Sequence, residues 1–267
     1  MIIEFIGSSG AGKTTLISEV RRRLAGQAQT VTSFELVAGR LGLQRVTHPT
    51  LRNLIQDLVG LPFFIGSLYR HRAFVVFALK ILARHKSSPF FTLNYLRSIV
   101  RKIGTYEIIR RAHHDRIILV DEGTLLSAHV LFVFTSTLTS QEDIDKFASL
   151  VPLPELVVYI KAPVESLVQR SLRRSDARKE MRSKDHTLVE KYVSRAAEMF
   201  DRLTETKRIR DRVLIVANPD ATEGERGAVA DQIATFILNY EAGGEPIPTI
   251  PAGPGERTSV IGKEHVS

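Results

Sequence analysis

The chain of 267 residues contains no cysteine and no tryptophan. The absence of cysteine excludes disulfides and thiolate metal sites, so we expect a reducing, cytoplasmic location. Tryptophan is missing and the basic residues are not interleaved with aromatic ones, a composition that does not support stacking on nucleic-acid bases. We therefore expect no nucleic-acid partner.

A long uninterrupted apolar run is also missing from the region where a membrane span would be sought. In the apolar stretch from Leu58 to Leu82, the longest uncharged piece is Leu58–Tyr69, which has 12 residues and contains Pro62. A transmembrane helix needs roughly 20 apolar residues, so we expect no transmembrane segment. A buried helix is the simplest interpretation, with peripheral contact to a membrane surface or a lipidic substrate as the alternative.

Basic residues outnumber acidic ones, with 37 Lys and Arg against 29 Asp and Glu and a formal net charge of +8. This excess favours anionic ligands, but nucleotides, nucleic acids and anionic lipid headgroups all fit it. The hydrophobic fraction of 43% is typical of a globular protein, and the length suits one large α/β domain.

Short apolar segments alternate with helical patterns along the chain. Ile2–Ile6 is followed by a helical pattern at Lys13–Leu24, and a long helical stretch occupies roughly residues 50 to 114. The remaining predicted strands are Val31–Val37, Arg116–Val120, Leu156–Ile160 and Arg212–Val216. Apolar strands separated by helices predict one five-stranded parallel sheet with helices on both faces.

Capping residues predict where several helices begin. Ser140, with Asp143 in the first turn, predicts one N-cap, and Ser88-Pro89 predicts another with proline at the first helical position. Two capping boxes, Thr187–Glu190 and Thr222–Glu225, predict the last two helices. We expect the first of these helices to align one row of side chains, namely Leu188, Tyr192, Ala196, Phe200 and Leu203.

One short segment carries a specific chemical signature, Gly7-Ser8-Ser9-Gly10-Ala11-Gly12-Lys13-Thr14. It fits the pattern Gly, four residues, Gly-Lys-Ser/Thr, with a predicted strand before it and a predicted helix after it. The glycines permit a backbone path that turns successive N–H groups toward a β-phosphate, and the helix adds its positive N-terminal end. Lys13 can reach the β- and γ-oxygens, and Thr14 can ligate Mg²⁺. The predicted cofactors are ATP and Mg²⁺, and the predicted nucleotide-binding residues here are Gly7, Ser8, Ser9, Gly10, Ala11, Gly12, Lys13, Thr14 and Thr15.

Two adjacent carboxylates, Asp121 and Glu122, follow the third predicted strand. The carboxyl ends of strands converge on the ligand crevice of a doubly wound sheet. Asp121 can there hold Mg²⁺ or accept the proton of an attacking hydroxyl, and Glu122 can assist as a base or position a water. We predict Lys13, Asp121 and Glu122 as catalytic residues, and Thr14 and Asp121 as metal ligands.

An arginine-rich segment follows the fourth predicted strand. Between Lys161 and Lys184 there are eight Lys or Arg residues against three Asp or Glu. On a helix, Arg170, Arg173 and Arg174 fall on a face separate from the apolar row. This composition suits a mobile lid over roughly residues 170 to 186 that closes on phosphates, because guanidinium groups match phosphate oxygens. A solvated basic helix is the alternative.

Taken in order, the phosphate loop, the Asp121 motif, the stretch Ala162–Arg174 and the final Asn218-Pro219-Asp220 resemble the thymidylate kinase and deoxynucleoside kinase group of P-loop kinases. The resemblance covers roughly residues 1 to 240. It implies a three-layer P-loop NTPase fold with an arginine-rich lid, ATP at the phosphate loop and a phosphotransfer activity.

The resemblance also implies roles for individual residues. Arg170 matches the position that often packs near adenine. Arg173 or Arg174 matches the positions that touch the transferred phosphate, and we predict Arg174 as catalytic and Arg173 as nucleotide-binding. Asn218, in the loop Ala217–Ala221, matches the segment that passes beside the adenine ring.

The acceptor side departs from the family pattern. The family usually has an arginine where this chain has Glu122, and the second-strand motif of thymidylate kinases is missing from Val31–Arg40. Arg70 and Arg72 fall where such kinases place acceptor-binding arginines. The acceptor therefore stays open between a nucleotide, a nucleoside and another metabolite.

The sequence thus predicts an ATP-dependent phosphotransferase that moves the γ-phosphate to a small-molecule acceptor. The main alternative is a P-loop ATPase or NTP-driven switch in which Asp121-Glu122 activates water. A third is a nucleic-acid or membrane-surface binder in which the nucleotide only regulates. No LSGGQ-like stretch precedes Asp121 and no Asn-Lys-x-Asp motif occurs, which disfavours a transporter ATPase and a GTPase.

We expect a single kinase-like domain at residues 1–240, with a helical acceptor region at about 45–114. Beyond Glu241 the Gly- and Pro-rich composition predicts a disordered tail at residues 241–267. A homodimer stays open, because long apolar helices at the edge of such sheets often pair.

Overall fold

At the centre of the structure, a computed structural model, lies a sheet of five parallel strands in the order β2-β3-β1-β4-β5. The structure describes residues 1–84, 89–112, 116–133, 139–173, 185–218 and 223–243. The strands are β1 (Ile2–Ile6), β2 (Thr30–Thr32), β3 (Ile117–Val120), β4 (Leu156–Lys161) and β5 (Val213–Ala217). The predicted parallel sheet is confirmed.

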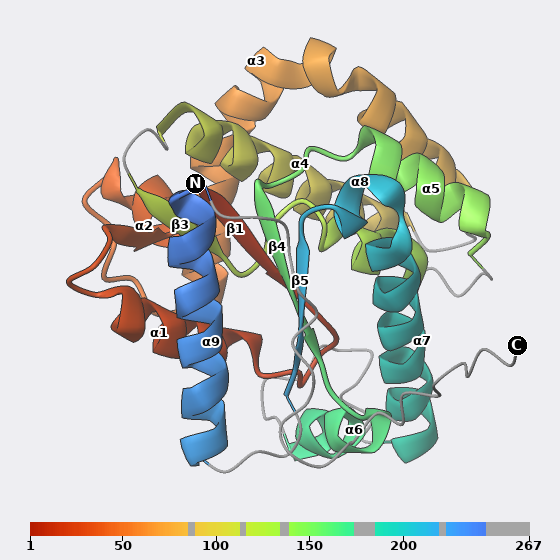
Figure 1. Cartoon of the computed structure of the whole chain (residues 1–267). Helices are drawn as coiled ribbons and strands as arrows, with labels where there is room; N and C mark the ends of the chain where they lie inside the picture. The colour runs from red at the N-terminus through yellow and green to blue at the C-terminus, as the bar shows by residue number, and fades with distance from the viewer. Residues whose placement is uncertain (85–88, 113–115, 134–138, 174–184, 219–222, 244–267) are drawn as a thin grey trace, which may run out of the picture.

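Helices lie on both faces of this sheet (Figure 1). The described helices are α1 (Lys13–Leu24), α2 (Ser33–Gly39), α3 (Pro49–Ala83), α4 (Pro89–Ala112), the π-helical turn η1 (His129–Val133), α5 (Gln141–Leu150), α6 (Val164–Arg173), α7 (His186–Glu205), α8 (Lys207–Arg210) and α9 (Glu223–Glu241). Phe5 and Val158 pack on the face covered by α1 and α9. Ile6 and Tyr159 point to the other face, against α3, α5 and α7. Both faces are buried, which explains why the strands are apolar throughout. This is the predicted three-layer α/β arrangement.

The second predicted strand, Val31–Val37, is wrong over most of its length. β2 ends at Thr32, and α2 begins at Ser33. The Thr32 hydroxyl accepts a hydrogen bond from Glu35 N, and the Glu35 carboxylate accepts one from Thr32 N. This capping box satisfies two backbone donors and starts a helix where the apolar pattern suggested a strand.

The predicted helical stretch at 50–114 consists of α3 and α4, which pack along each other. Gly60 and Gly104 meet where the two helices cross. A methyl group added at Gly104 would lie 2.2 Å from Gly60 O. The close contact therefore depends on the absence of a side chain at this position.

Only one face of α3 is buried, so the interpretation of Leu58–Leu82 as a buried helix is half right. Phe64 and Phe74 lie in the core, whereas Leu58, Ile65 and Tyr69 are exposed. In the part of the chain that the structure describes, no helix has both the length and the hydropathy to span a bilayer.

The helix starts are partly as predicted. Ser140 caps α5 by accepting a hydrogen bond from Asp143 N, as expected. The capping box at Thr187 is wrong, because Asp185 caps α7 and its carboxylate accepts bonds from Thr187 N and Leu188 N. Leu188 is exposed, and its neighbour Val189 is buried. Ser88, Thr222 and the predicted tail beyond Gly243 lie outside the described residues.

Candidate nucleotide-binding site

The loop between β1 and α1 has the backbone path that its glycines predict. Gly7, Gly10 and Gly12 have φ angles of 145°, 81° and 86°. Side chains would also collide with neighbouring elements here. A Cβ at Gly7 would lie 2.6 Å from Ile160 O, and one at Gly12 would lie 2.7 Å from Asn218 Nδ2. The loop is thus held both by its own dihedral angles and by the contacts of β4 and the end of β5.

Lys13 is the first residue of α1 and follows the left-handed Gly12. Its ammonium group donates to Gly7 O at 2.8 Å and to Ser8 O at 3.0 Å. These bonds curl the side chain back over the loop that precedes it. The positive charge is therefore concentrated where the N-terminus of α1 also favours an anion.

Thr14 and Asp121 come together at the beginning of α1 and the end of β3. The Thr14 hydroxyl donates to Asp121 Oδ2 at 3.0 Å. Hydroxyl and carboxylate oxygens are the hard donors that Mg²⁺ prefers when it binds a nucleotide through one or two protein ligands. Thr14 and Asp121, predicted as metal ligands, therefore offer oxygen atoms that suit Mg²⁺, and the two side chains are in contact.

Three side chains from distant elements brace the loop backbone. Arg170 Nη1 donates to Gly10 O at 3.2 Å, and the neighbouring Ser171 hydroxyl donates to Ser9 O at 3.4 Å. Asn218 Nδ2 donates to Ala11 O at 2.7 Å, and the Asn218 side chain is buried. Arg170 and Asn218, predicted to lie near adenine, thus hold the loop itself. Ser171 was missed, because a serine within an amphipathic helix gives no local signal of such a contact.

The remaining predicted lid residues lie at or beyond the end of α6. Arg173 is the last residue of α6 and is exposed. Arg174 and the rest of the predicted lid up to residue 184 lie outside the described residues. The lid therefore stays a prediction.

A group of charged side chains lies behind the strand-end carboxylates. Lys102 of α4 forms an ion pair with Glu122 over 3.8 Å. The Lys102 side chain is 3% exposed, whereas that of Glu122 is 52% exposed. The inserted helical region thus delivers a buried cation to the carboxylate that follows Asp121.

Glu4 belongs to the same group and is buried in the middle of β1. Its carboxylate accepts hydrogen bonds from Leu126 N at 3.1 Å and from the Thr124 hydroxyl at 3.4 Å. Burial raises the pKa of Glu4 from 4.5 to about 7, against the opposing effects of backbone N–H groups and the Lys102 charge. The sequence signal for this buried group is a carboxyl residue within an otherwise apolar strand, which the sequence analysis missed.

The arginines predicted to bind the acceptor have partners within the helical pair. Arg70 forms an ion pair with the buried Glu107 at 3.2 Å, and Arg72 lies over the ring of Tyr69. Burial raises the pKa of Glu107, but hydrogen bonds from Arg110 and His71 outweigh it and leave the pKa below its usual value. Arg70 is therefore part of a structural ion cluster.

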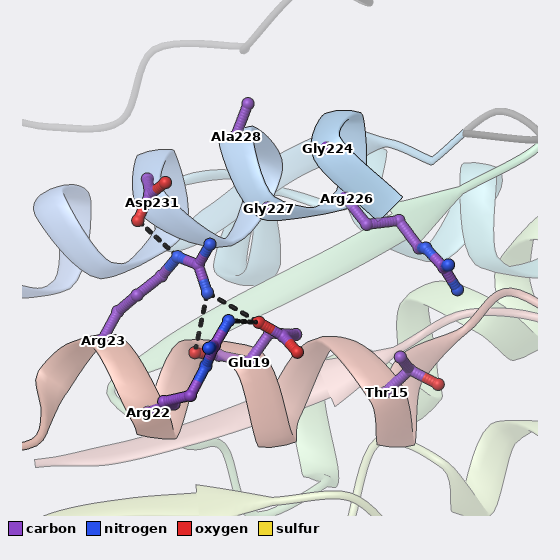
Figure 2. Close-up of a pocket in the computed structure, with 9 residues that line it drawn as sticks. All are labelled: Thr15, Glu19, Arg22, Arg23, Gly224, Arg226, Gly227, Ala228 and Asp231. Carbon is purple, nitrogen blue, oxygen red and sulfur yellow. Dashed lines mark hydrogen bonds and ion pairs between the residues drawn. The ribbon is translucent and has the colours of Figure 1, made fainter. Parts of the chain in front are cut away.

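A cavity of about 470 Å³ lies between α1 and α9 (Figure 2). Thr15, two residues past Lys13, lines one end of it, and Arg226 extends toward that end in Figure 2. Arg23 donates to Glu19 Oε2 at 2.7 Å and also pairs with Asp231, so the other end is closed by ion pairs. Thr15 thus lies where the phosphate loop and this cavity adjoin.

No protein-family model and no curated protein matches the chain. Solved structures similar to it include a shikimate kinase from Bacteroides thetaiotaomicron, with 12% identity over 89% of this chain and 98% of the other and a TM-score of 0.43. A deoxyadenosine kinase from M. mycoides with bound dCTP has 15% identity over 90% and 100%, with a TM-score of 0.43. A shikimate kinase from Acinetobacter baumannii in complex with shikimate has 14% identity over 91% and 93%, with a TM-score of 0.40. These three similar structures are kinases.

Proposed function

We propose that the chain is an ATP-dependent phosphotransferase of thymidylate kinase-like type, which moves the γ-phosphate of ATP to a small-molecule acceptor. The observation that carries this proposal is the 3.0 Å hydrogen bond between Thr14 and Asp121 at the edge of a glycine-built phosphate loop. It joins a hydroxyl and a carboxylate beside a loop whose lysine and helix N-terminus favour phosphate.

Each described residue of this site has a defined task in the proposal. The loop from Gly7 to Gly12 binds the β-phosphate through its N–H groups, and Lys13 neutralises the β- and γ-oxygens. Thr14 and Asp121 hold Mg²⁺, which supplies charge neutralisation for the transferred phosphoryl group. Alternatively, Asp121 accepts the proton of the attacking hydroxyl.

The arginines of α6 and the residues after it complete the phosphate site in the proposal. Arg170 fixes the loop through Gly10 O, which supports a place close to the nucleotide. Arg173 and Arg174 are proposed to reach the γ-phosphate when the lid at about 170–186 closes. Asn218 supports the loop from the side on which we place the adenine.

Lys102 supports transfer to an acceptor over hydrolysis. It comes from the helical region that we propose forms the acceptor pocket, and it pairs with Glu122. A cation here can attract an anionic or polar acceptor group. The acceptor class, a nucleotide, nucleoside or other metabolite, is what the proposal leaves to experiment.

The alternative is a P-loop ATPase or NTP-driven switch. The half-exposed Glu122 directly after Asp121 is the observation that favours it, because a carboxylate in this place can orient an attacking water. In that case the ion pair with Lys102 orients the Glu122 carboxylate toward an attacking water molecule rather than toward an acceptor.

An ADP-release assay over panels of nucleosides, nucleotides and sugars tests the proposal. We expect turnover that depends on one acceptor class, is abolished in Lys13→Ala and falls strongly in Asp121→Ala. Lys146→Ala, a variant of an exposed lysine on α5, is the matched control and should keep full activity. ADP release that needs only water and is lost in Glu122→Gln would establish the ATPase instead.

We also propose that residues 1–240 form the single catalytic domain and that the protein works in the cytoplasm. The absence of cysteine supports a reducing location. A thermal-shift screen of acceptors with a non-hydrolysable ATP analogue would narrow the substrate, because a ligand of the native state raises its apparent stability.

A further inference from the structure

Asp121 and Glu122 lie between two attachments of the chain to β1. On one side, β3 pairs with β1 as far as Val120, which lies opposite Glu4. On the other side, the segment Gly123–Leu126 contacts the side chain of Glu4. One residue of β1 therefore adjoins the chain both immediately before and shortly after the two strand-end carboxylates.

Glu4 points away from the face of the sheet that α1 covers. Ile3 and Phe5, on either side of it, pack on that face, so Glu4 points to the opposite face. There it is buried, with 2% of its surface exposed, and Lys102 of α4 acts on its charge. Carboxyl groups are rarely buried to this extent, so a glutamate in this place calls for a specific role.

The Glu4 carboxyl group forms two polar contacts with the segment beyond Glu122. Its Oε1 accepts a hydrogen bond from Leu126 N at 3.1 Å, and its Oε2 lies 3.4 Å from the Thr124 hydroxyl oxygen. The Thr124 hydroxyl also donates to Pro152 O at 2.5 Å. One carboxyl group therefore joins β1 to the chain after Glu122 and, through Thr124, to the residues that precede β4.

The Thr124 hydroxyl has a single proton for these two neighbours. When it donates this proton to Pro152 O, the closer neighbour, its contact with Glu4 is completed by the proton of a neutral carboxyl group. Burial raises the pKa of Glu4 to about 7, so this neutral form is present at neutral pH. A glutamine at position 4 can make the same bonds, because its amide oxygen accepts and its NH₂ group donates.

Gly123 allows the chain to lie directly against the Glu4 carboxyl group. A Cβ at Gly123 would overlap Cδ and both carboxyl oxygens of Glu4. The residue after Glu122 must therefore lack a side chain while Glu4 is in place. Lys102 adds a further connection, because its ammonium group acts on Glu4 and pairs with Glu122 over 3.8 Å. These contacts set how closely the chain after Asp121 approaches β1.

We propose that Glu4 is a positioning residue of the phosphotransfer proposed above: it holds the chain beyond the strand-end carboxylates so that Asp121 stays in contact with Thr14. This role rests on the proposed function, which makes Asp121 a Mg²⁺ ligand. Because Glu4 is buried, it acts through the segment Gly123–Leu126 and not on the nucleotide itself. Its loss should impair Mg²⁺-dependent steps more than nucleotide binding, since misplacing a catalytic group by about 1 Å can cost about 100-fold in rate.

Two measurements on the full chain test this role: ADP release, with the acceptor or with water, and the affinity for a non-hydrolysable ATP analogue with and without Mg²⁺. Glu4→Leu keeps the bulk of the side chain and removes both polar contacts. It should lower kcat about 30-fold, leave KM for ATP within about twofold, and lose most of the affinity that Mg²⁺ adds. Glu4→Gln should restore kcat to within about threefold of the unchanged protein, because it can make the same bonds.

Gly123→Ala displaces the same segment without removing a polar group. We expect it to lower kcat about tenfold or more at unchanged KM for ATP. Glu155→Leu is the matched control, because the Glu155 carboxylate also accepts a hydrogen bond from a backbone N–H of β1, that of Ile2, at the opposite end of the strand. It should keep kcat and the effect of Mg²⁺, and thermal unfolding shows whether each variant is folded.

Unchanged kcat and unchanged Mg²⁺ dependence in a folded Glu4→Leu protein overturn the positioning role and leave the proposed function intact. Equal losses in Glu4→Leu and Glu155→Leu overturn it as well, because they report only a weakened sheet. If Glu4→Leu does not fold, full kcat in Gly123→Ala overturns the role. An unchanged protein that binds no ATP analogue refutes the proposed function, and the role of Glu4 with it.

Discussion

The Thr14 hydroxyl donates to Asp121 Oδ2 over 3.0 Å, although 107 residues separate the two in the chain. β1 and β3 are hydrogen-bonded neighbours, so the loop that follows β1 and the carboxylate that follows β3 emerge side by side. The parallel sheet thereby brings two separate sequence motifs together at one edge.

If Thr14 and Asp121 hold Mg²⁺, ATP turnover should depend on both the hydroxyl group of residue 14 and the negative charge of residue 121. Thr14→Ser keeps the hydroxyl and should keep ATP turnover within about threefold, whereas Thr14→Val and Asp121→Asn should lower it about 100-fold or more, or roughly 2.7 kcal/mol of transition-state stabilisation. Turnover measured over a Mg²⁺ titration checks this. Equal activity of the serine and valine variants would exclude Thr14 as a ligand.

Gly26, which lies outside the phosphate loop, serves as a control for Gly12, which lies within it. Both have a φ of 86°, but a Cβ at Gly12 meets Asn218 Nδ2 at 2.7 Å and one at Gly26 meets nothing within 4 Å. Gly26→Ala should therefore cost about 1 kcal/mol of stability from backbone conformation alone. Gly12→Ala should cost more and should also weaken binding of an ATP analogue. Urea denaturation and nucleotide titration of the two variants give the comparison, and identical losses would refute it.

Stability should depend on pH through Glu4. Burial raises its pKa from 4.5 to about 7, so between these values the folded state binds a proton that the unfolded state has lost. The contribution of Glu4 to stability is therefore full below pH 4.5 and is lost as the pH rises through about 7, in total about 3 kcal/mol. Lys102 is the cation that acts on Glu4 from α4, and Glu122 shares that lysine.

Glu4→Gln removes this titration. The variant should lose less stability than the unchanged protein when urea denaturation at pH 5 is compared with that at pH 8. The same pH dependence in both proteins would show that Glu4 does not titrate in this range.

The crossing of α3 and α4 should tolerate no side chain at Gly104. Gly104→Ala places a methyl 2.2 Å from Gly60 O, a backbone atom that cannot rotate away. We expect a loss of roughly 2 kcal/mol or more from the separation of the two helices. Gly66→Ala, on the open side of the same helix pair, should be neutral or stabilise by up to about 1 kcal/mol, because alanine favours the helix. Thermal unfolding of both variants decides this, and a stable Gly104→Ala protein would contradict the contact.

Local patterns account for what the sequence predicted correctly. The phosphate loop is a contiguous segment whose glycines, lysine and threonine each act through their own backbone or side chain. The strands are short apolar runs, and the Ser140 cap lies three residues from the N–H that it binds. Such features depend on neighbours in the chain, so they can be inferred without knowing the packing.

The errors arose where two local patterns competed. Val31–Val37 is apolar enough for a strand, but Thr32 and Glu35 form a capping box that starts α2. At α7, Asp185 and Thr187 both suit an N-cap, and the aspartate two residues earlier caps the helix. In each case the side chain that bound the free N–H groups decided the boundary.

By itself the sequence determined the phosphate loop, the strand-end Asp121 and the alternation that makes a parallel sheet. Only the tertiary structure decided that Lys102 meets Glu122, that Asn218 braces Ala11, and that Phe64 of α3 is buried whereas Leu58 and Tyr69 are exposed. The physical reason is that these contacts join side chains on separate elements. Their partners are fixed by how α3, α4 and β5 pack on the sheet, which residue spacing along the chain does not encode.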